Sequence, residues 1–391
     1  MSAIQSSFPG LETEPLPITR DGVTLQLKLR RASGAAPGAP AVLILHGGNS
    51  SGMTYTAPNG GLAGYLREQG IDVWLLEWRA SPFVVDPLLA GPPLHGSAEA
   101  ERRFFNLDLA ASEDIPHALQ RVRAEIGEDT PLSIMGHCLS GAVVAMAVAR
   151  GVLEPFRVGS VILLTLGLFV EVPWNGWLKA EDFILERIVH NDRECRGIDP
   201  KAPKKWPKDM AAGYEKWPAA WLPQGPELLR ALSFMVGQPY TPERVAKELR
   251  TADVAKYFGT MHLGIYLHTG QLVRRGFCGP LNAPDVIDRP RLDRQKPSRV
   301  AQSDLRPEHF RDKHITLIGG SENHIWHRDS LDLMYEWLRN NGGSAATTEK
   351  HVLPGYNLQE LLWGLRAREQ VYPLIERGVR SVRRLAQRAA E

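Results

Sequence analysis

The sequence has few cysteines, no excess of one charge and no long hydrophobic run, and each absence excludes a class of protein. Three cysteines in 391 residues are too few for a disulfide framework and too scattered for a zinc site. The 46 lysines and arginines nearly balance the 44 aspartates and glutamates, whereas a nucleic-acid-binding protein carries a basic stripe. We therefore expect neither a metal ion nor nucleic acid as a partner.

Membrane and export signals are also missing. The most apolar run, Val161–Val170, has about half the length of a membrane-spanning helix and is typical of a buried strand. Residues 1–17 contain neither the basic nor the apolar part of a secretion signal. The basic segment Arg377–Arg388 is typical of a solvated helix face. These features predict a soluble, cytoplasmic protein with no integral membrane segment.

What the first half does contain is an alternation of short apolar runs and helical patterns. Ile115, Leu119, Val122 and Ile126 recur at the spacing of one helix face. Short, fully apolar strands between helices are typical of a parallel sheet that is covered on both sides. The predicted strands are Val23–Leu29, Ala41–Leu45, Val73–Leu76, Leu132–Met135 and Ser160–Val170.

The alternation stops after residue 170 and resumes near residue 313. A strand at His314–Ile318, a helix at Leu331–Arg339 and a last strand at Glu349–Leu353 are predicted there. The fold class is therefore α/β, with a mostly parallel sheet in two parts, 1–170 and 313–391. Residues 171–312 are predicted to form a cap inserted into that sheet domain.

The turn after Leu132–Met135 is the strongest chemical motif. It has the pattern G-x-C-x-S-G at Gly136–Gly141 and leads directly into a helix of small residues. Such a strand–turn–helix elbow exposes a nucleophile at the carboxyl edge of the sheet, here Cys138. A helix N-terminus favours a thiolate, so the motif predicts a lowered thiol pKa. The alternative is that Cys138 is a small buried apolar residue.

An oxyanion hole is predicted beside the elbow. His46-Gly47-Gly48 follows the strand Ala41–Leu45, and the amide of Gly48 together with that of Leu139 would hold a developing oxyanion. His46 itself is predicted to be structural. No G-x-G-x-x-G motif for a flavin occurs, and no cofactor is expected.

Further motifs are spread along most of the chain. They are Asp21-Gly22, His46-Gly47, Trp74–Ser81, Asp108–Pro116, Gly136–Cys138, Phe258-Gly259, His268, Val273–Gly276, Gly320–Asn323, Leu353–Tyr356 and Val371–Pro373. Together these motifs resemble the α/β-hydrolase module at the C-terminal end of cholesterol-oxidase-like flavoproteins of the glucose–methanol–choline family and, more distantly, polyhydroxyalkanoate synthases. This resemblance implies an esterase, thioesterase or acyltransferase acting on a lipophilic acyl substrate.

The chain departs from the resembling family at two positions. Asn323 stands where hydrolases place an acid, although an amide can still orient an imidazole. Leu358 stands where the base histidine belongs, and a leucine cannot accept a proton. The nearest substitutes in the sequence are His324, His327, His351 and His137, of which His324 is the first candidate.

Two functions therefore remain open at the level of sequence. A thiol depends on a base less than a hydroxyl does, so Cys138 could still transfer or hydrolyse acyl groups. Alternatively, the chain is a degenerate pseudo-hydrolase that binds a lipophilic ligand or a partner protein. Aromatic residues of the cap would form an apolar wall over the site, or only the cap's own core; they are Trp174, Trp177, Trp217, Trp221 and Phe258.

Overall fold

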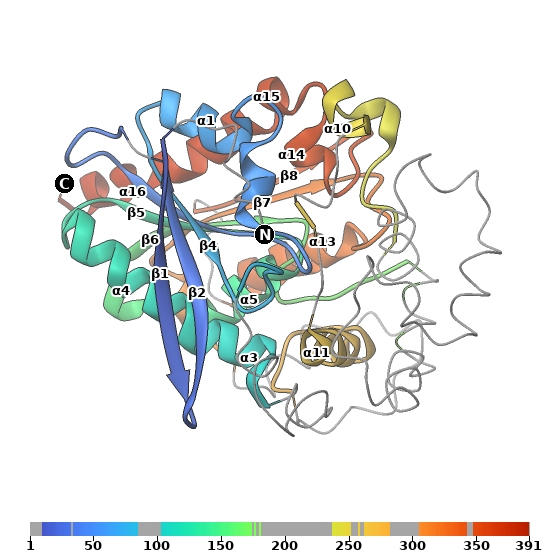
Figure 1. Cartoon of the computed structure of the whole chain (residues 1–391), viewed down its shortest axis with the longest axis horizontal. Helices are drawn as coiled ribbons and strands as arrows, with labels where there is room; N and C mark the ends of the chain where they lie inside the picture. Colours follow the sequence, from blue (N-terminus) through green and yellow to red (C-terminus); the bar gives the residue numbers. More distant parts are fainter. Residues whose placement is uncertain are drawn as a thin grey trace.

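The centre of the molecule is a single sheet of eight strands in the order β1-β2-β4-β3-β5-β6-β7-β8 (Figure 1). The computed structural model describes residues 10–32, 34–84, 103–173, 176, 180, 237–251, 257–258, 262–281, 305–341 and 347–390. The strands are β1 Leu11–Arg20, β2 Val23–Ala32, β3 Ala41–Leu45, β4 Asp72–Glu77, β5 Leu132–His137, β6 Val158–Leu164, β7 His314–Gly320 and β8 Thr348–Leu353.

In sheet order, the strands from β4 to β8 run parallel, and the hairpin β1–β2 at one edge adds β2 as the single strand that runs in the opposite direction. Every residue of β3, β4 and β5 is buried, as expected for strands that are covered on both faces. The carboxyl ends of β3 and β5 are neighbours, with Leu45 paired to Gly136. The segments that follow these two strands therefore meet at one edge of the sheet.

Helices cover both faces of the sheet. The helices α1 Gly61–Glu68, α14 Glu360–Trp363, α15 Ala367–Gln370 and α16 Tyr372–Ala390 supply one buried apolar cluster. A second cluster on the other face contains α4 Ile115–Ile126, α5 Leu139–Ala149 and α13 Asp329–Asn341. Shorter elements complete the described chain: α3 Leu107–Leu109, the π-helical turn η3 Ala110–Asp114, and the 3₁₀ turns η1 Gly52–Thr56, η4 Glu154–Phe156, η7 Pro242–Arg244 and η9 Pro307–Phe310.

The structure confirms the expected fold class, and most predicted elements differ from the observed ones by a few residues at their ends. The largest error is the strand Ser160–Val170, because β6 ends at Leu164. The next residue, Thr165, has a φ of 74°, a left-handed conformation that a β-branched residue rarely adopts and that a strand cannot continue through. The chain turns out of the sheet there, so the rest of the apolar run packs in the core as loop.

The strand β1 was not predicted. Its sequence contains Pro15 and Pro17 and alternates only weakly, which argues against a central strand. The structure places it at the edge of the sheet, where a missing backbone N–H costs least. The turn Asp21-Gly22 that was expected to lead into β2 is the tip of this hairpin.

Part of the interval 171–312 is described. It contains α10 Lys247–Thr251 and the longer helix α11 Leu263–Arg275, which lies next to α3 (Figure 1). Bridges join Phe258 to Ser50 and Phe277 to Phe169. Trp174, Trp177, Trp217 and Trp221 lie outside the described residues. Within the described part of the chain, no helix is both long and apolar enough to cross a membrane.

Candidate active site

Cys138 lies at the turn between β5 and α5. Its backbone has φ 59° and ψ −130°, a strained conformation that lifts the side chain out of the turn. A Cβ on Gly136 would lie 2.4 Å from the carbonyl oxygen of Ser140, and one on Gly141 would lie 2.3 Å from that of Leu166. The motif therefore has glycine where strand and helix approach too closely for any side chain.

Ser140 fixes the geometry of this turn. Its hydroxyl donates to the carbonyl oxygen of Leu45 at 2.8 Å and accepts from the amide of His137 at 2.9 Å. Leu45 ends β3 and His137 ends β5, so one buried hydroxyl joins the carboxyl ends of the two central strands. The small polar residue of the motif thus holds the elbow against the loop that follows β3.

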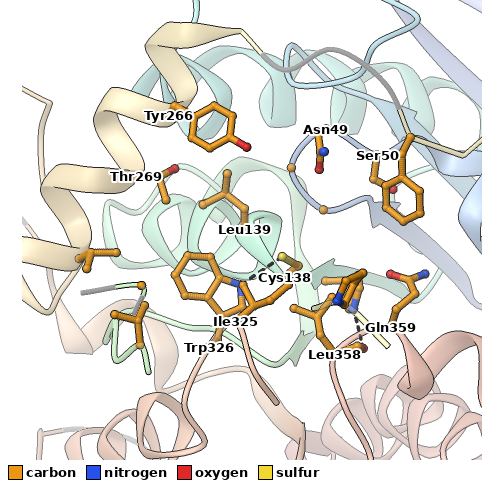
Figure 2. Close-up of a pocket in the computed structure, with 18 of the residues that line it drawn as sticks. Asn49, Ser50, Cys138, Leu139, Tyr266, Thr269, Ile325, Trp326, Leu358 and Gln359 are labelled. Carbon is orange, nitrogen blue, oxygen red and sulfur yellow. Dashed lines mark hydrogen bonds between the residues drawn. The ribbon is translucent and has the colours of Figure 1, made fainter. Parts of the chain in front are cut away.

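Three N–H groups surround the sulfur of Cys138. The indole Nε1 of Trp326 donates to Sγ at 3.1 Å, as Figure 2 shows. The backbone amides of Leu139 and Gly48 also lie close enough to the sulfur to lower the pKa of Cys138. The two amides that were predicted as an oxyanion hole therefore converge on the same point as the side chain of Cys138.

The thiol is nevertheless harder to ionise than a free cysteine. Burial raises the pKa of Cys138, and the hydrogen bonds from Trp326, Leu139 and Gly48 lower it by less than burial raises it. The prediction of a lowered pKa from the helix N-terminus was wrong for a physical reason. Removing a thiolate from water costs more than three neutral donors return in this enclosed site.

The loop after β7 carries Asn323, which was expected to orient an imidazole, and His324, which was expected to act as the base. Asn323 is buried, and its Oδ1 accepts the amides of Ile325 at 2.9 Å and Trp326 at 3.0 Å. Its amide therefore orients a backbone turn rather than an imidazole. This turn brings Trp326 over Cys138, so Asn323 acts on the site through the indole.

His324, the first candidate for a base, points elsewhere. Its side chain is exposed, and its backbone amide donates to Oδ1 of Asn357 at 3.2 Å. His327 is exposed beside Asp329, and His351 bonds Glu349 at 3.2 Å. None of the three lines the pocket that contains Cys138.

Leu358 does lie at the site and is 4% exposed. Its carbonyl oxygen accepts a hydrogen bond from Nε2 of His137 at 3.3 Å. Burial lowers the pKa of His137 to about 4, so this imidazole is neutral at physiological pH. His137 bridges the elbow to the last-strand loop and is the only one of the four candidate histidines that lines the pocket.

His46 contacts the loop that carries Gly48 through the neighbouring residue Gly47. Its ring is completely buried, with Nδ1 2.7 Å from the carbonyl oxygen of Gly47 and Nε2 3.5 Å from a carboxylate oxygen of Glu77. Burial lowers its pKa and outweighs the nearby carboxylate. Glu77 in turn accepts the amide of Gly52 at 3.1 Å. These contacts agree with the structural role that the sequence predicted for His46.

A pocket of about 1000 Å³, including its open mouth, has Cys138 on its wall. The helix α11 contributes Tyr266, Thr269 and Val273, and Phe258 also lines the space. No charged side chain lines it among the described residues. Those residues also contain no group of three His, Cys, Asp or Glu side chains that could hold a metal ion.

Comparison with known proteins gives a likeness in structure alone. No protein-family model and no curated protein matches the sequence. DcsB, solved in complex with its substrate analogue, matches with a TM-score of 0.52 at 14% identity, over 95% of this chain and 98% of that one. The epoxide hydrolase VrEH1 from Vigna radiata matches with a TM-score of 0.52 at 12% identity, over 96% and 100%. This chain has the α/β-hydrolase fold.

In this α/β-hydrolase fold, the elbow and the Gly48 loop follow neighbouring strands, as the sequence predicted. The side chains that sequence reasoning missed come from loops and from α11. Trp326 lies 188 positions after Cys138, and neither its spacing nor its type identified it. Tyr266 and Gln359 also line the pocket. For Gln359 the sequence offered one clue, its place directly after Leu358, and for Tyr266 it offered none.

Proposed function

We propose that this protein transfers or hydrolyses the acyl group of a lipophilic ester or thioester through Cys138. The observation that carries this proposal is the convergence of Sγ with the amides of Gly48 and Leu139 on the wall of a pocket whose described lining residues are all uncharged. Those amides can stabilise an oxyanion as it forms. The motifs that resemble the flavoprotein-linked hydrolase module support the same chemistry.

In the first step, Sγ of Cys138 bonds to the carbonyl carbon and loses its proton to solvent. The carbonyl oxygen becomes an oxyanion that accepts hydrogen bonds from the amides of Gly48 and Leu139. These amides are free to leave the sulfur of Cys138, because a sulfur bonded to an acyl carbon is a poor acceptor. When this tetrahedral intermediate collapses, the bond between the carbonyl carbon and the leaving group breaks, and the leaving group departs and takes up a proton from solvent. Water or an acceptor alcohol or thiol then attacks the acyl-cysteine and regenerates the thiol.

The absence of a base at Leu358 favours thioesters over oxygen esters. A leaving thiolate is about as stable as the attacking thiolate, so the exchange needs little help from an acid or base. A leaving alkoxide is far more basic and needs a proton donor. The neutral His137, whose Nε2 is committed to Leu358, is poorly placed to supply one.

Two further parts of the proposal concern the whole chain. We propose that residues 171–312 form a cap, since α11 from this interval lines the pocket beside Cys138. We also propose a cytoplasmic location. Cys138 and Cys278 are both free thiols, and the cytoplasm keeps thiols reduced.

The test compares matched decanoyl substrates, a thioester and the corresponding oxygen ester, in the wild type, Cys138→Ala and Cys138→Ser. We expect slow turnover of the thioester by the wild type, at least tenfold faster than of the oxygen ester. Both variants should be inactive, because serine needs the missing base. Equal activity of the Ser variant would contradict the proposal and require a working base elsewhere.

A second function is favoured by one observation, the raised pKa of Cys138 beside a leucine in place of the base. Under this alternative the protein is a pseudo-hydrolase that binds a lipophilic ligand or a partner protein. It predicts that no ester or thioester turns over, even after Leu358→His, while a lipophilic ligand still binds.

A further inference from the structure

We propose that one end of the Cys138 pocket is a subsite for an uncharged head group with hydrogen-bonding oxygen or amide groups. The subsite is formed by Asn49, Ser50, Tyr266 and Gln359. The inference rests on the proposed function in one respect: the head group would be the leaving part of the reacting thioester or ester.

The four residues are polar and buried, and one of them has an unpaired donor. Their exposed fractions are 6% for Asn49, 4% for Ser50, 6% for Tyr266 and 2% for Gln359. Nε2 of Gln359 is a buried donor with no partner. The side chains of Asn49, Ser50 and Tyr266 line the same pocket. Because a buried donor without a partner costs about 1–3 kcal/mol, the unpaired Nε2 of Gln359 among these polar neighbours points to a ligand.

Contacts around Trp363 bring Ser50 and Gln359 to the same end of the pocket. Ser50 bridges to Phe258, whose ring centroid lies 5.7 Å from that of Trp363. The amide of Trp363 donates to the carbonyl oxygen of Gln359 at 2.9 Å. Its indole donates to the carbonyl oxygen of Thr54, also at 2.9 Å, which ties the segment after Ser50 to α14.

Figure 2 shows the arrangement around the sulfur. Asn49, Ser50 and Gln359 lie on one side of Cys138, and the hydroxyl of Tyr266 points toward that side from α11. Ile325 and Trp326 lie on the other side. The pocket thus has a polar end and an apolar end with the thiol between them, which matches a molecule with an acyl chain and a polar head joined at the carbonyl.

The described residues of the polar end favour an uncharged head group over a charged one. No charged side chain of the described residues lines the pocket, and a buried charge without a partner is strongly unfavourable. Burial raises the pKa of Tyr266, so its phenol stays protonated and donates. Two side-chain amides, a hydroxyl and a phenol can all pair with an amide or hydroxyl of the ligand.

Binding to the Cys138→Ala variant tests the subsite without any dependence on catalysis. Three decanoyl thioesters are compared by isothermal titration calorimetry, with N-acetylcysteamine, ethanethiol or 3-mercaptopropionate as the thiol part. We expect the neutral amide head of N-acetylcysteamine to bind about tenfold more tightly than the apolar ethyl head. The anionic head should bind most weakly.

Two further substitutions locate the effect. In the same background, Tyr266→Phe and Gln359→Leu should each weaken binding of the N-acetylcysteamine thioester about fivefold and leave the ethyl thioester unchanged. The control is Thr269→Val, because Thr269 lines the pocket but its hydroxyl already donates to the carbonyl oxygen of Ile265 at 2.8 Å. This control should change neither affinity.

Equal affinity for the three thioesters would overturn the subsite, as would unchanged selectivity in both variants. Failure of acyl transfer has a different signature, since selective binding by Cys138→Ala would persist while the wild type turned nothing over. Thermal unfolding of each variant shows whether it is folded before it is titrated.

Discussion

The indole N–H of Trp326 donates a hydrogen bond to the sulfur of Cys138 across 3.1 Å. The indole has a donor and no acceptor, so the side chain that hydrogen-bonds the thiol cannot act as its base. The contact stabilises a thiolate once it has formed but cannot remove the proton. It makes the chemistry of this site depend on how easily Cys138 ionises by itself.

Replacing Trp326 with Phe removes this donor and keeps most of the ring. Because the hydrogen bond lowers the pKa of Cys138, the variant's thiol should ionise at higher pH than that of the wild type. The pH profile of iodoacetamide alkylation, followed on the Cys138 peptide by mass spectrometry, measures this shift. Ile325→Val, which changes the neighbouring side chain without removing a donor, should leave the profile in place.

The wild-type profile is itself a prediction. Burial raises the pKa of Cys138, so alkylation should keep accelerating at pH values above about 8.5, where an ordinary cysteine is already half ionised. A plateau reached below neutral pH would show an activated thiolate and contradict this account. The same profile measured in urea should return to that of an ordinary cysteine.

Asn323 should stabilise the fold through its side-chain oxygen, which accepts two backbone hydrogen bonds. Asn323→Ala leaves the amides of Ile325 and Trp326 without their acceptor, which should cost about 1–3 kcal/mol in the free energy of unfolding. Asn323→Asp keeps an acceptor and should cost less. Urea denaturation compares the two, and equal losses would show that the hydrogen bonds to the turn are unimportant.

Gly141 in α5 and Gly270 in α11 should respond differently to alanine. A Cβ on Gly141 would lie 2.3 Å from the backbone oxygen of Leu166, whereas the nearest atom to one on Gly270 is a side-chain nitrogen of Arg274 at 3.7 Å. Gly141→Ala should therefore destabilise the protein by several kcal/mol, about 3 or more. Gly270→Ala should be neutral or stabilise α11 by up to about 1 kcal/mol. Urea denaturation measures the free energy of unfolding of both variants. Equal values for Gly141→Ala and Gly270→Ala would contradict the close packing at the elbow.

Leu358→His tests whether the last-strand loop still has the geometry of a working site. The loop is held firmly, since Oδ1 of the buried Asn357 accepts the amide of Leu358 at 2.7 Å and the Asn357 amide donates to Glu360 at 2.9 Å. A histidine there should raise kcat/KM for the decanoyl thioester at least tenfold, because a positioned base contributes about 10²–10⁴. Leu358→Gln is the control and should give no gain. No gain from histidine would favour the binding-protein alternative.

The sequence predicted the parts of this molecule that depend on local patterns. Ala41–Leu45 forms β3 without a change at either end, because a short apolar run between turn residues has few alternatives. The G-x-C-x-S-G turn is similar, since its glycines serve contacts within a few residues or with the next strand. The strand β1 was missed because its prolines are tolerated only at an edge, and the sequence does not show which strand is the edge.

The side chains around Cys138 could not be predicted in this way. Asn323 was assigned the orientation of an imidazole, whereas it turns the backbone toward Trp326. The thiol pKa was assigned from the helix N-terminus, whereas enclosure by distant segments dominates it. Tyr266 comes from α11, and only the fold brings this helix to the elbow. The position of Tyr266 and the burial of Cys138 depend on contacts between residues more than a hundred positions apart, and the turn that Asn323 holds is important only because it brings Trp326 to the distant Cys138.

Trapping of an acyl-enzyme tests the central claim most directly. The wild type is mixed with decanoyl-N-acetylcysteamine near pH 8, quenched in acid and analysed by intact mass and by peptide mapping. We predict one added decanoyl group on the peptide that contains Cys138, and none in Cys138→Ala. An unmodified wild-type protein, with the thioester consumed or untouched, would contradict nucleophilic catalysis by Cys138.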